Sequence, residues 1–468
     1  MSGTGGHAAE LLALCKDALQ EAGEAEVEVC ARQKARGFAR FAVGELGQHM
    51  DIEDPLVVVR VAHGRRLAEG GTMRLEKSAI VRAIRDASAA ARFVPETEGF
   101  PGFTDAKEPS FEAPNRFARS TAGSTAEDRV TLLGPVLESI RKAGLVSAGM
   151  LETSTTSLAV ATTGGCARAH DATLAVFKTW ALETPGAGGA AGYGGHMHRD
   201  VDALDLEGET ERAIRIAKMS QNPIALDAGT YDVVMEPPAV AELLEWLGNI
   251  AFGAAEIEQG TSPAAGRAGA MITGESITMI EDPLDASELG AASPFDREGV
   301  WRRRVPLIEN GVAREILYDR TYAARMGRAS TGSSILTDLG SSGGIGACTL
   351  SLGAGKAASV EELISGVDRG LYICRLHYVN GLLEPRRAVM TGLTRDGCFL
   401  IEKGKITRAV GNMRFTDSFL EALARSDGMT RERRAIPTWW SDAGACVTPA
   451  VRMRGVRFNG KSQEKSQL

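Results

Sequence analysis

Residues 241–253 read AELLEWLGNIAFG, and this stretch decides how the rest of the chain is interpreted. Apolar residues recur at helical spacing and form one continuous stripe: Val240, Leu243, Leu244, Leu247 and Ala251. Glu242 and Glu245 fall on the remaining surface. The spacing predicts a helix that packs against a core through one face and keeps a polar face.

Strand and turn signals follow this helix to the end of the chain. Asn310-Gly311 in VPLIENGVAREIL and Lys403-Gly404 in CFLIEKGKITRAV are typical of hairpin turns between two strands. We therefore predict that residues 226–468 form a domain rich in antiparallel β-sheet, which carries the helix near its start.

The sequence before the helix combines helical and strand patterns in two units. Residues 1–95 contain the helical pattern ELLALCKDALQEAG, the alternating pattern EAEVEVCAR and a second helical pattern. Residues 96–125 are rich in proline, glycine and charge, which is typical of a linker. Residues 126–225 again mix helix and strand. The sequence thus predicts an α+β fold: an N-terminal α/β domain (1–95), a linker (96–125), a central α/β domain (126–225) and the β-rich C-terminal domain (226–468).

Length and composition limit the class of protein. With 468 residues, the chain exceeds the roughly 250–300 residues at which a single core stops growing. The formal net charge of −7 argues against a surface that binds nucleic acid. No stretch approaches the ~18 uninterrupted apolar residues of a membrane span, and the N-terminus lacks the basic region of a signal peptide. Seven cysteines occur singly, as in a reducing compartment. We expect a cytoplasmic protein without nucleic-acid or membrane partners.

Two further groups of residues are candidates for a site. His196 and His198 in GGHMHRD share one side of a strand, if this segment is extended, but no third metal ligand is fixed by spacing. A solvent-facing loop is the simpler interpretation of this glycine-rich segment. Trp439 and Trp440 are adjacent, which is typical either of an aromatic pair that caps a core or of a wall that contacts a peptide.

The order of these segments resembles the TldD/PmbA family, in which PmbA is also called TldE. The resemblance extends roughly from Leu11 to Phe458 and includes AEVEVCAR, DLEGETERAIRIAKMSQNP, SPFDREGVWRRRVPLIENG and CVTPAVRMRGVRF. The place of a GDFS-like run common in the family is taken by MTGLTRDG. The resemblance implies an α+β fold with a sheet-rich C-terminal domain.

The resemblance also implies what the helix at 241–253 replaces. In the TldD branch, an HExxxH helix that follows a pair of leucines supplies two zinc ligands and a general base. The corresponding positions here are Glu245, Trp246 and Ile250. Isoleucine cannot ligate a metal and tryptophan cannot take a proton from water, so we expect no catalytic residue at these degenerate motif positions.

A cysteine near the C-terminus completes the zinc site in the TldD branch, and Cys446 lies near that position. A single thiolate does not hold zinc. We therefore expect no cofactor in this chain and zinc in a partner subunit. If the chain did bind metal by itself, the fallback ligands would be His196, His198 and Cys446.

The resemblance implies a non-catalytic PmbA/TldE-like subunit of a cytosolic TldD/TldE-type zinc metalloprotease complex that processes or degrades unfolded peptides. Its partners would be a TldD-like zinc subunit and an extended peptide, with Trp439, Trp440, His196 and His198 as candidates for lining the peptide path. Two alternatives are a stand-alone enzyme that uses the family cavity for different chemistry, and a homo-oligomeric peptide-binding protein whose partner is a second copy of itself, as in a homodimer.

Overall fold

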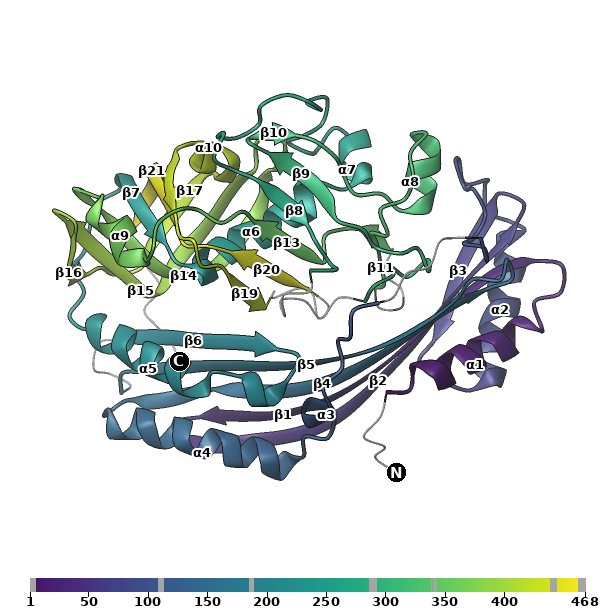
Figure 1. Ribbon diagram of the computed structural model, residues 1–468, viewed down its shortest axis with the longest axis horizontal. Coiled ribbons are helices and arrows are strands. Elements are labelled where there is room, and N and C mark those ends of the chain that lie inside the picture. Colours follow the sequence, from purple (N-terminus) through teal and green to yellow (C-terminus); the bar gives the residue numbers. More distant parts are fainter. Residues whose placement is uncertain are drawn as a thin grey trace.

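The computed structural model describes residues 6–107, 113–184, 189–285, 293–337, 339, 343–437 and 444–461. A long curved sheet forms the lower layer in Figure 1, and a second, β-rich body lies on its inner face. Helices cover the outer face of the sheet, so the molecule has three layers: helices, the long sheet and the C-terminal body. The predicted α+β class is confirmed.

The long sheet is antiparallel throughout and has the strand order β3-β2-β1-β4-β5-β6. Its strands are β1 (Glu26–Ala42), β2 (Glu45–His63), β3 (Arg66–Thr72), β4 (Val146–Thr162), β5 (Ala167–Leu182) and β6 (Ala191–His198). Several of these strands are much longer than the usual 3–10 residues, and this length gives the sheet its reach beneath the C-terminal body.

Strands from residues 1–95 and from residues 126–225 belong to this one sheet. β1 pairs with β4 without interruption from Glu28 opposite Thr162 to Ala42 opposite Ala148. The boundary that the sequence suggests between these two units is therefore not visible in the sheet. The physical reason is that alternation of apolar and polar residues identifies a strand but not the partner strand beside it.

Helices pack in pairs on the outer face (Figure 1). α1 (Ala8–Leu19) and α2 (Lys77–Ala91) cover one end, where Leu11, Ile80 and Ile84 are buried against the strands. α4 (Ala126–Lys142) and α5 (Leu206–Met219) cover the other end. α3 (Arg119–Ala122) and the 3₁₀ turn η1 (Val201–Ala203) are short connections.

The C-terminal body contains two larger sheets and a two-stranded ribbon. One sheet has the order β10-β9-β8-β13-β20-β19, the other has the order β14-β7-β21-β17-β15-β16 with β18 on β21, and β11 pairs with β12. The strands are β7 (Gly229–Met235), β8 (Met279–Glu281), β9 (Val305–Glu309), β10 (Val312–Ala313), β11 (Ser334–Ile335), β12 (Gly344–Ile345), β13 (Thr349–Leu352), β14 (Arg369–Glu384), β15 (Val389–Glu402), β16 (Lys405–Ala409), β17 (Met413–Ser418), β18 (Ser426–Met429), β19 (Arg434–Pro437), β20 (Ala445–Thr448) and β21 (Val451–Lys461). The helical elements are α6 (Pro237–Ala251), α7 (Ala254–Glu258), α8 (Arg320–Arg325), α9 (Val360–Ser365), η2 (Pro385–Arg387) and α10 (Phe419–Ala424).

The two hairpin turns predicted from sequence are confirmed. Asn310 and Gly311 connect β9 to β10, and Lys403 and Gly404 connect β15 to β16. All four residues have positive φ, the conformation that two-residue hairpin loops require. Most strand pairs in this body are antiparallel, whereas β7–β14 and β13–β20 are parallel.

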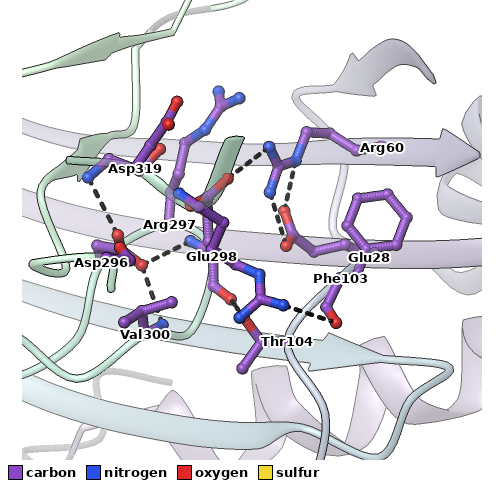
Figure 2. A network of polar contacts seen from close by, with 12 residues as sticks. Glu28, Arg60, Phe103, Thr104, Asp296, Arg297, Glu298, Val300 and Asp319 are labelled. Carbon is purple, nitrogen blue, oxygen red and sulfur yellow. Dashed lines mark hydrogen bonds and ion pairs between the residues drawn. The ribbon is translucent and has the colours of Figure 1, made fainter. Parts of the chain in front are cut away.

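A buried network of charges joins the long sheet to the C-terminal body (Figure 2). Arg60 of β2 donates from Nε and Nη2 to the two carboxylate oxygens of Glu28, at 2.7 and 2.8 Å. Its Nη1 donates to Glu298 Oε1 of the C-terminal body at 2.8 Å. The backbone carbonyl of Glu298 accepts from Thr104 Oγ1 at 2.6 Å. This hydrogen bond connects the predicted linker to the C-terminal body. The network therefore connects three segments that lie far apart in sequence.

Asp296 holds the loop that presents Glu298. Its carboxylate accepts from the backbone N–H groups of Glu298, Val300 and Ser334 at 2.9–3.0 Å. Burial, and then the nearby charge of Glu298, raise the pKa of Asp296 to about 7. One buried carboxylate, both oxygens of which accept hydrogen bonds, therefore fixes the conformation of this loop.

Candidate functional site

Helix α6 is the predicted helix, and it lies between the two larger sheets of the C-terminal body. Pro237 and Pro238 occupy its first positions, where proline leaves no hydrogen bond unmade. The apolar stripe is buried, with Leu244 and Leu247 fully inaccessible to solvent. The helix is therefore held rigidly by its core face, and its other face is available to shape a site.

The three degenerate motif positions lie in different surroundings. Ile250 is 5% exposed and belongs to the C-terminal core, where a polar ligand would be buried among apolar groups. Trp246 lies against Gly381 of β14 so closely that a Cβ there would meet its ring at 2.9 Å. Glu245 alone faces a pocket. Two of the three positions are thus filled by packing residues.

The pocket lies where α6 meets the long sheet, and its solvent-accessible space of about 20 Å³ has room for about one water molecule. Lys178 of β5, Tyr193 of β6 and Arg375 of β14 are among the residues that line it. Residues of α6 and β19 complete the lining: Pro238, Ala241, Glu242, Glu245, Ile436 and Pro437. The site is therefore built jointly by the N-terminal sheet and the C-terminal body.

Arg375 is fixed in this pocket by three neighbours. Its Nη1 donates to Asp396 Oδ2 at 2.5 Å, and its guanidinium carbon lies 5.3 and 4.8 Å from the ring centroids of Trp180 and Tyr193. Trp180 Nε1 donates to the same Asp396 oxygen at 2.9 Å. The charge of Arg375 is therefore held at one place by a carboxylate and two aromatic faces.

Lys178 is the second cation of the pocket. Burial, and then the charge of Arg375, lower its pKa, while the carboxylates of Glu152, Glu242 and Glu245 act in the opposite direction. The lysine is thus within electrostatic reach of both glutamates on the facing helix.

Cys446 of β20 is 2% exposed and belongs to the same core as α6. Burial, and then the charges of Glu245, Glu281 and Glu242, raise its pKa well above the usual range of a thiol. Cys446 therefore lies beside the degenerate helix, as the resemblance implies.

The histidine pair lies on β6, and each imidazole has a backbone partner. His196 Nδ1 accepts from the backbone N–H of Asp205 at 3.0 Å. His198 Nδ1 accepts from the backbone N–H of Asp200 at 2.9 Å. Within the part of the chain that the structure describes, no three His, Cys, Asp or Glu side chains are grouped so that they could hold a metal ion. The structure therefore does not bring His196, His198 and Cys446 together, whereas Trp439 and Trp440 lie outside the described residues.

Sequence reasoning missed the cationic side of this pocket. Lys178 stands in the strand LAVFKTWAL between the buried residues Phe177 and Thr179. A lysine inside such an apolar strand could have been noted as a candidate site residue. Arg375 likewise stands in a largely apolar strand, between the buried residues Cys374 and Leu376. Neither residue has a sequence neighbour that points to α6, so only the fold places them there.

All seven cysteines are free, which agrees with their single occurrence along the sequence. Among the described residues, none of the helices combines the length and apolar character that a membrane crossing requires.

Comparison with known proteins places these features in context. Residues 228–460 match the PmbA/TldA metallopeptidase C-terminal domain. A metalloprotease of Methanothermobacter thermautotrophicus is 27% identical over 279 residues, which are 58% of this chain and 59% of the relative. A TldD homologue described as a metalloprotease, from Buchnera aphidicola, is 25% identical over 243 residues, 51% of this chain and 49% of the relative. The matches thus span about half of each of these relatives.

Two solved structures share the fold over nearly the whole chain. TldE from Thermococcus kodakarensis has a TM-score of 0.84 at 21% identity, and the match covers 97% of this chain and 100% of that one. A putative modulator of a DNA gyrase from Thermotoga maritima has a TM-score of 0.81 at 19% identity, with 96% and 98% covered. At these identities the likeness is one of fold.

Proposed function

Since this chain belongs to the TldD/PmbA metallopeptidase family, we propose that it is a non-catalytic, PmbA/TldE-like subunit of a zinc peptidase complex. The observation that carries the proposal is which residues occupy the motif positions of α6. Its motif positions hold Glu245, Trp246 and Ile250, of which two serve packing. A helix in this state offers neither the two imidazoles nor the general base that a zinc peptidase needs.

The partner in this proposal is a TldD-like chain that carries the zinc. The present chain contributes walls: the inner face of the long sheet, the polar face of α6 and the pocket between them. An unfolded peptide binds in extended form, held chiefly through its backbone, so the complex has weak sequence preference. Seven free cysteines, six of them buried, support a reducing compartment such as the cytosol.

The test combines metal analysis with a peptidase assay. The purified chain is analysed for zinc and assayed on an unstructured peptide, alone and after co-expression with a homologue that carries HExxxH. We expect no stoichiometric zinc and no cleavage by the chain alone, and cleavage by the co-purified pair. The matched control replaces the HExxxH glutamate of the homologue with glutamine, which abolishes cleavage while leaving the pair associated.

Two outcomes would overturn the proposal. About one zinc per isolated chain, with chelator-sensitive cleavage, would make the chain an enzyme in its own right. A stable homodimer that binds peptide but has no affinity for the homologue would make it a peptide-binding protein without a protease partner.

A further inference from the structure

Three large apolar side chains project into solvent from the end of β14. Tyr378 is 67% exposed, Leu382 is 61% exposed and Leu383 is 52% exposed. No other stretch of six residues in the described part of the chain exposes three such side chains. Single exposed apolar residues are common on protein surfaces, whereas a group of them marks an interaction surface.

The backbone beside these side chains forms an open edge of the sheet. β7 pairs with β14 only from Gly370 to Ile373, and β15 occupies the opposite side of β14. Among the residues that the structure describes, no strand pairs with residues 378–384 on the side of β7. An open edge offers N–H and C=O groups to a strand of another chain.

This edge lacks the residues that usually protect an exposed strand. Residues 376–383 read LHYVNGLL and contain no Lys, Arg, Asp, Glu or Pro, the residues that hinder pairing with another chain. A bulge in the pairing with β15 lies at Tyr378, whose φ is 50°, and bulges re-aim side chains. The ring remains exposed, so the bulge does not hide this apolar group.

Two copies of this strand complement each other. Tyr378 and Leu382 lie two residues on either side of Asn380, and all three residues are exposed. In an antiparallel pair with a two-fold axis at Asn380, Tyr378 of each copy lies opposite Leu382 of the other. Cross-strand contacts between apolar side chains stabilise a sheet, and like charges do not meet because residues 376–383 carry no Lys, Arg, Asp or Glu.

We propose that residues 378–384 of β14 form the contact through which two copies of this chain associate as an isologous dimer, with the two strands antiparallel about Asn380. Because the contact is smaller than a standard protein–protein interface, we expect a reversible dimer that forms at micromolar concentrations. The inference goes beyond the proposed function and does not depend on it, since both copies supply the same edge.

Sedimentation velocity of the full chain over a range of concentrations tests the proposal. We expect a reversible equilibrium between monomer and dimer. Leu382→Lys removes an apolar contact and adds the charge that natural edges carry, so we expect the dissociation constant to rise about tenfold or more. The control Phe93→Lys changes an isolated apolar residue that is 87% exposed, and it leaves the equilibrium unchanged.

A cysteine at the axis tests the register independently. Antiparallel pairing about Asn380 places the two Cα atoms of this residue about 4.5–5.5 Å apart, within reach of a disulfide. We expect mild oxidation of Asn380→Cys to give a covalent dimer on a non-reducing gel, in higher yield than for Asn459→Cys, which is exposed on β21. Six of the seven native cysteines are buried and contribute little background.

The inference is overturned if the chain stays monomeric, if Leu382→Lys associates like Phe93→Lys, or if Asn380→Cys yields no more covalent dimer than Asn459→Cys. Melting curves verify that each variant is folded. Failure of the inference is separable from failure of the proposed function. A monomeric chain that still supports cleavage together with the HExxxH homologue removes this inference alone.

Discussion

The long sheet meets the C-terminal body at two charged places, around Arg60 and around Lys178, and the two are built differently. All three guanidinium nitrogens of Arg60 donate to carboxylate oxygens of Glu28 and Glu298, and the side chains involved are at most 6% exposed. Lys178 instead lines a pocket, and several carboxylates act together on its pKa. The first place is filled by its buried ion pairs, whereas the second borders a pocket.

The contact between the long sheet and the C-terminal body therefore contains two kinds of charged site. A buried charge is tolerated when its partners are complete, and removing one partner leaves an uncompensated charge in the interior. We therefore assign the Arg60 network to holding the layers together.

The largest effect is expected for Arg60→Leu. The substitution leaves Glu28 and Glu298 buried without a cation, and we expect a loss of about 3–5 kcal/mol in the free energy of unfolding. Urea denaturation measures it. The control Arg74→Leu removes an exposed pair with Glu76 and is expected to cost less than about 1 kcal/mol. Equal losses for the two variants would contradict the distinction drawn here.

A pH effect is expected from Glu281, a buried carboxyl group that accepts from the backbone N–H groups of Cys348 and Thr349. Burial raises its pKa from 4.5 to about 7. Because the folded-state pKa is the higher one, this stabilisation is present below about pH 4.5 and is lost as the pH rises to about 7. Its size is at most roughly 3 kcal/mol.

The measurement compares unfolding of the wild-type protein and Glu281→Gln between these pH values. The variant lacks the titrating group, so the stability of the wild type relative to the variant should fall as pH increases. A constant difference across the range would show that Glu281 titrates normally.

A smaller effect is expected for Trp180→Phe, which keeps the aromatic face but removes the Nε1 hydrogen bond to Asp396. Asp396 keeps Arg375 as a partner, so we expect a loss of about 1–3 kcal/mol, measured by urea denaturation. The control Tyr231→Phe removes a hydrogen bond to Asp227 in an exposed region and should change stability by about 0.5 kcal/mol or less. A similar loss in both variants would mean that the hydrogen bond from Trp180 to Asp396 contributes no more than an exposed one.

The smallest effect on stability is expected for Lys178→Met. The variant keeps an unbranched chain of similar length, and Glu242 and Glu245 are only half-buried, so water can solvate their charges and the free energy of unfolding should change by about 1 kcal/mol or less. Urea denaturation alongside Arg60→Leu gives a direct comparison of two cation removals in one interface. A loss as large as that of Arg60→Leu would place Lys178 with the structural network instead.

Local features of this fold were predictable from sequence, and long-range ones were not. The stripe from Val240 to Ala251 identifies α6, and Asn310-Gly311 identifies a hairpin, because both depend on neighbours a few residues apart. The approach of Arg60 to Glu298 spans 238 residues of sequence, and nothing local indicates it. The same holds for the candidate site: Glu245 was identified through its place in a motif, whereas Lys178 reaches the pocket only because of how the layers stack.

The position of β1 in the middle of the long sheet has a consequence for synthesis of the chain. β1 pairs with β2 as soon as both have left the ribosome, but its other edge waits for β4, which begins at Val146. At typical translation rates of ~5–20 residues per second, this edge stays open for roughly 5–20 seconds. An open strand edge invites pairing with other chains, and charged side chains counter it. Arg32, Lys34 and Arg36 lie along β1, so the strand carries its own protection against aggregation while it waits.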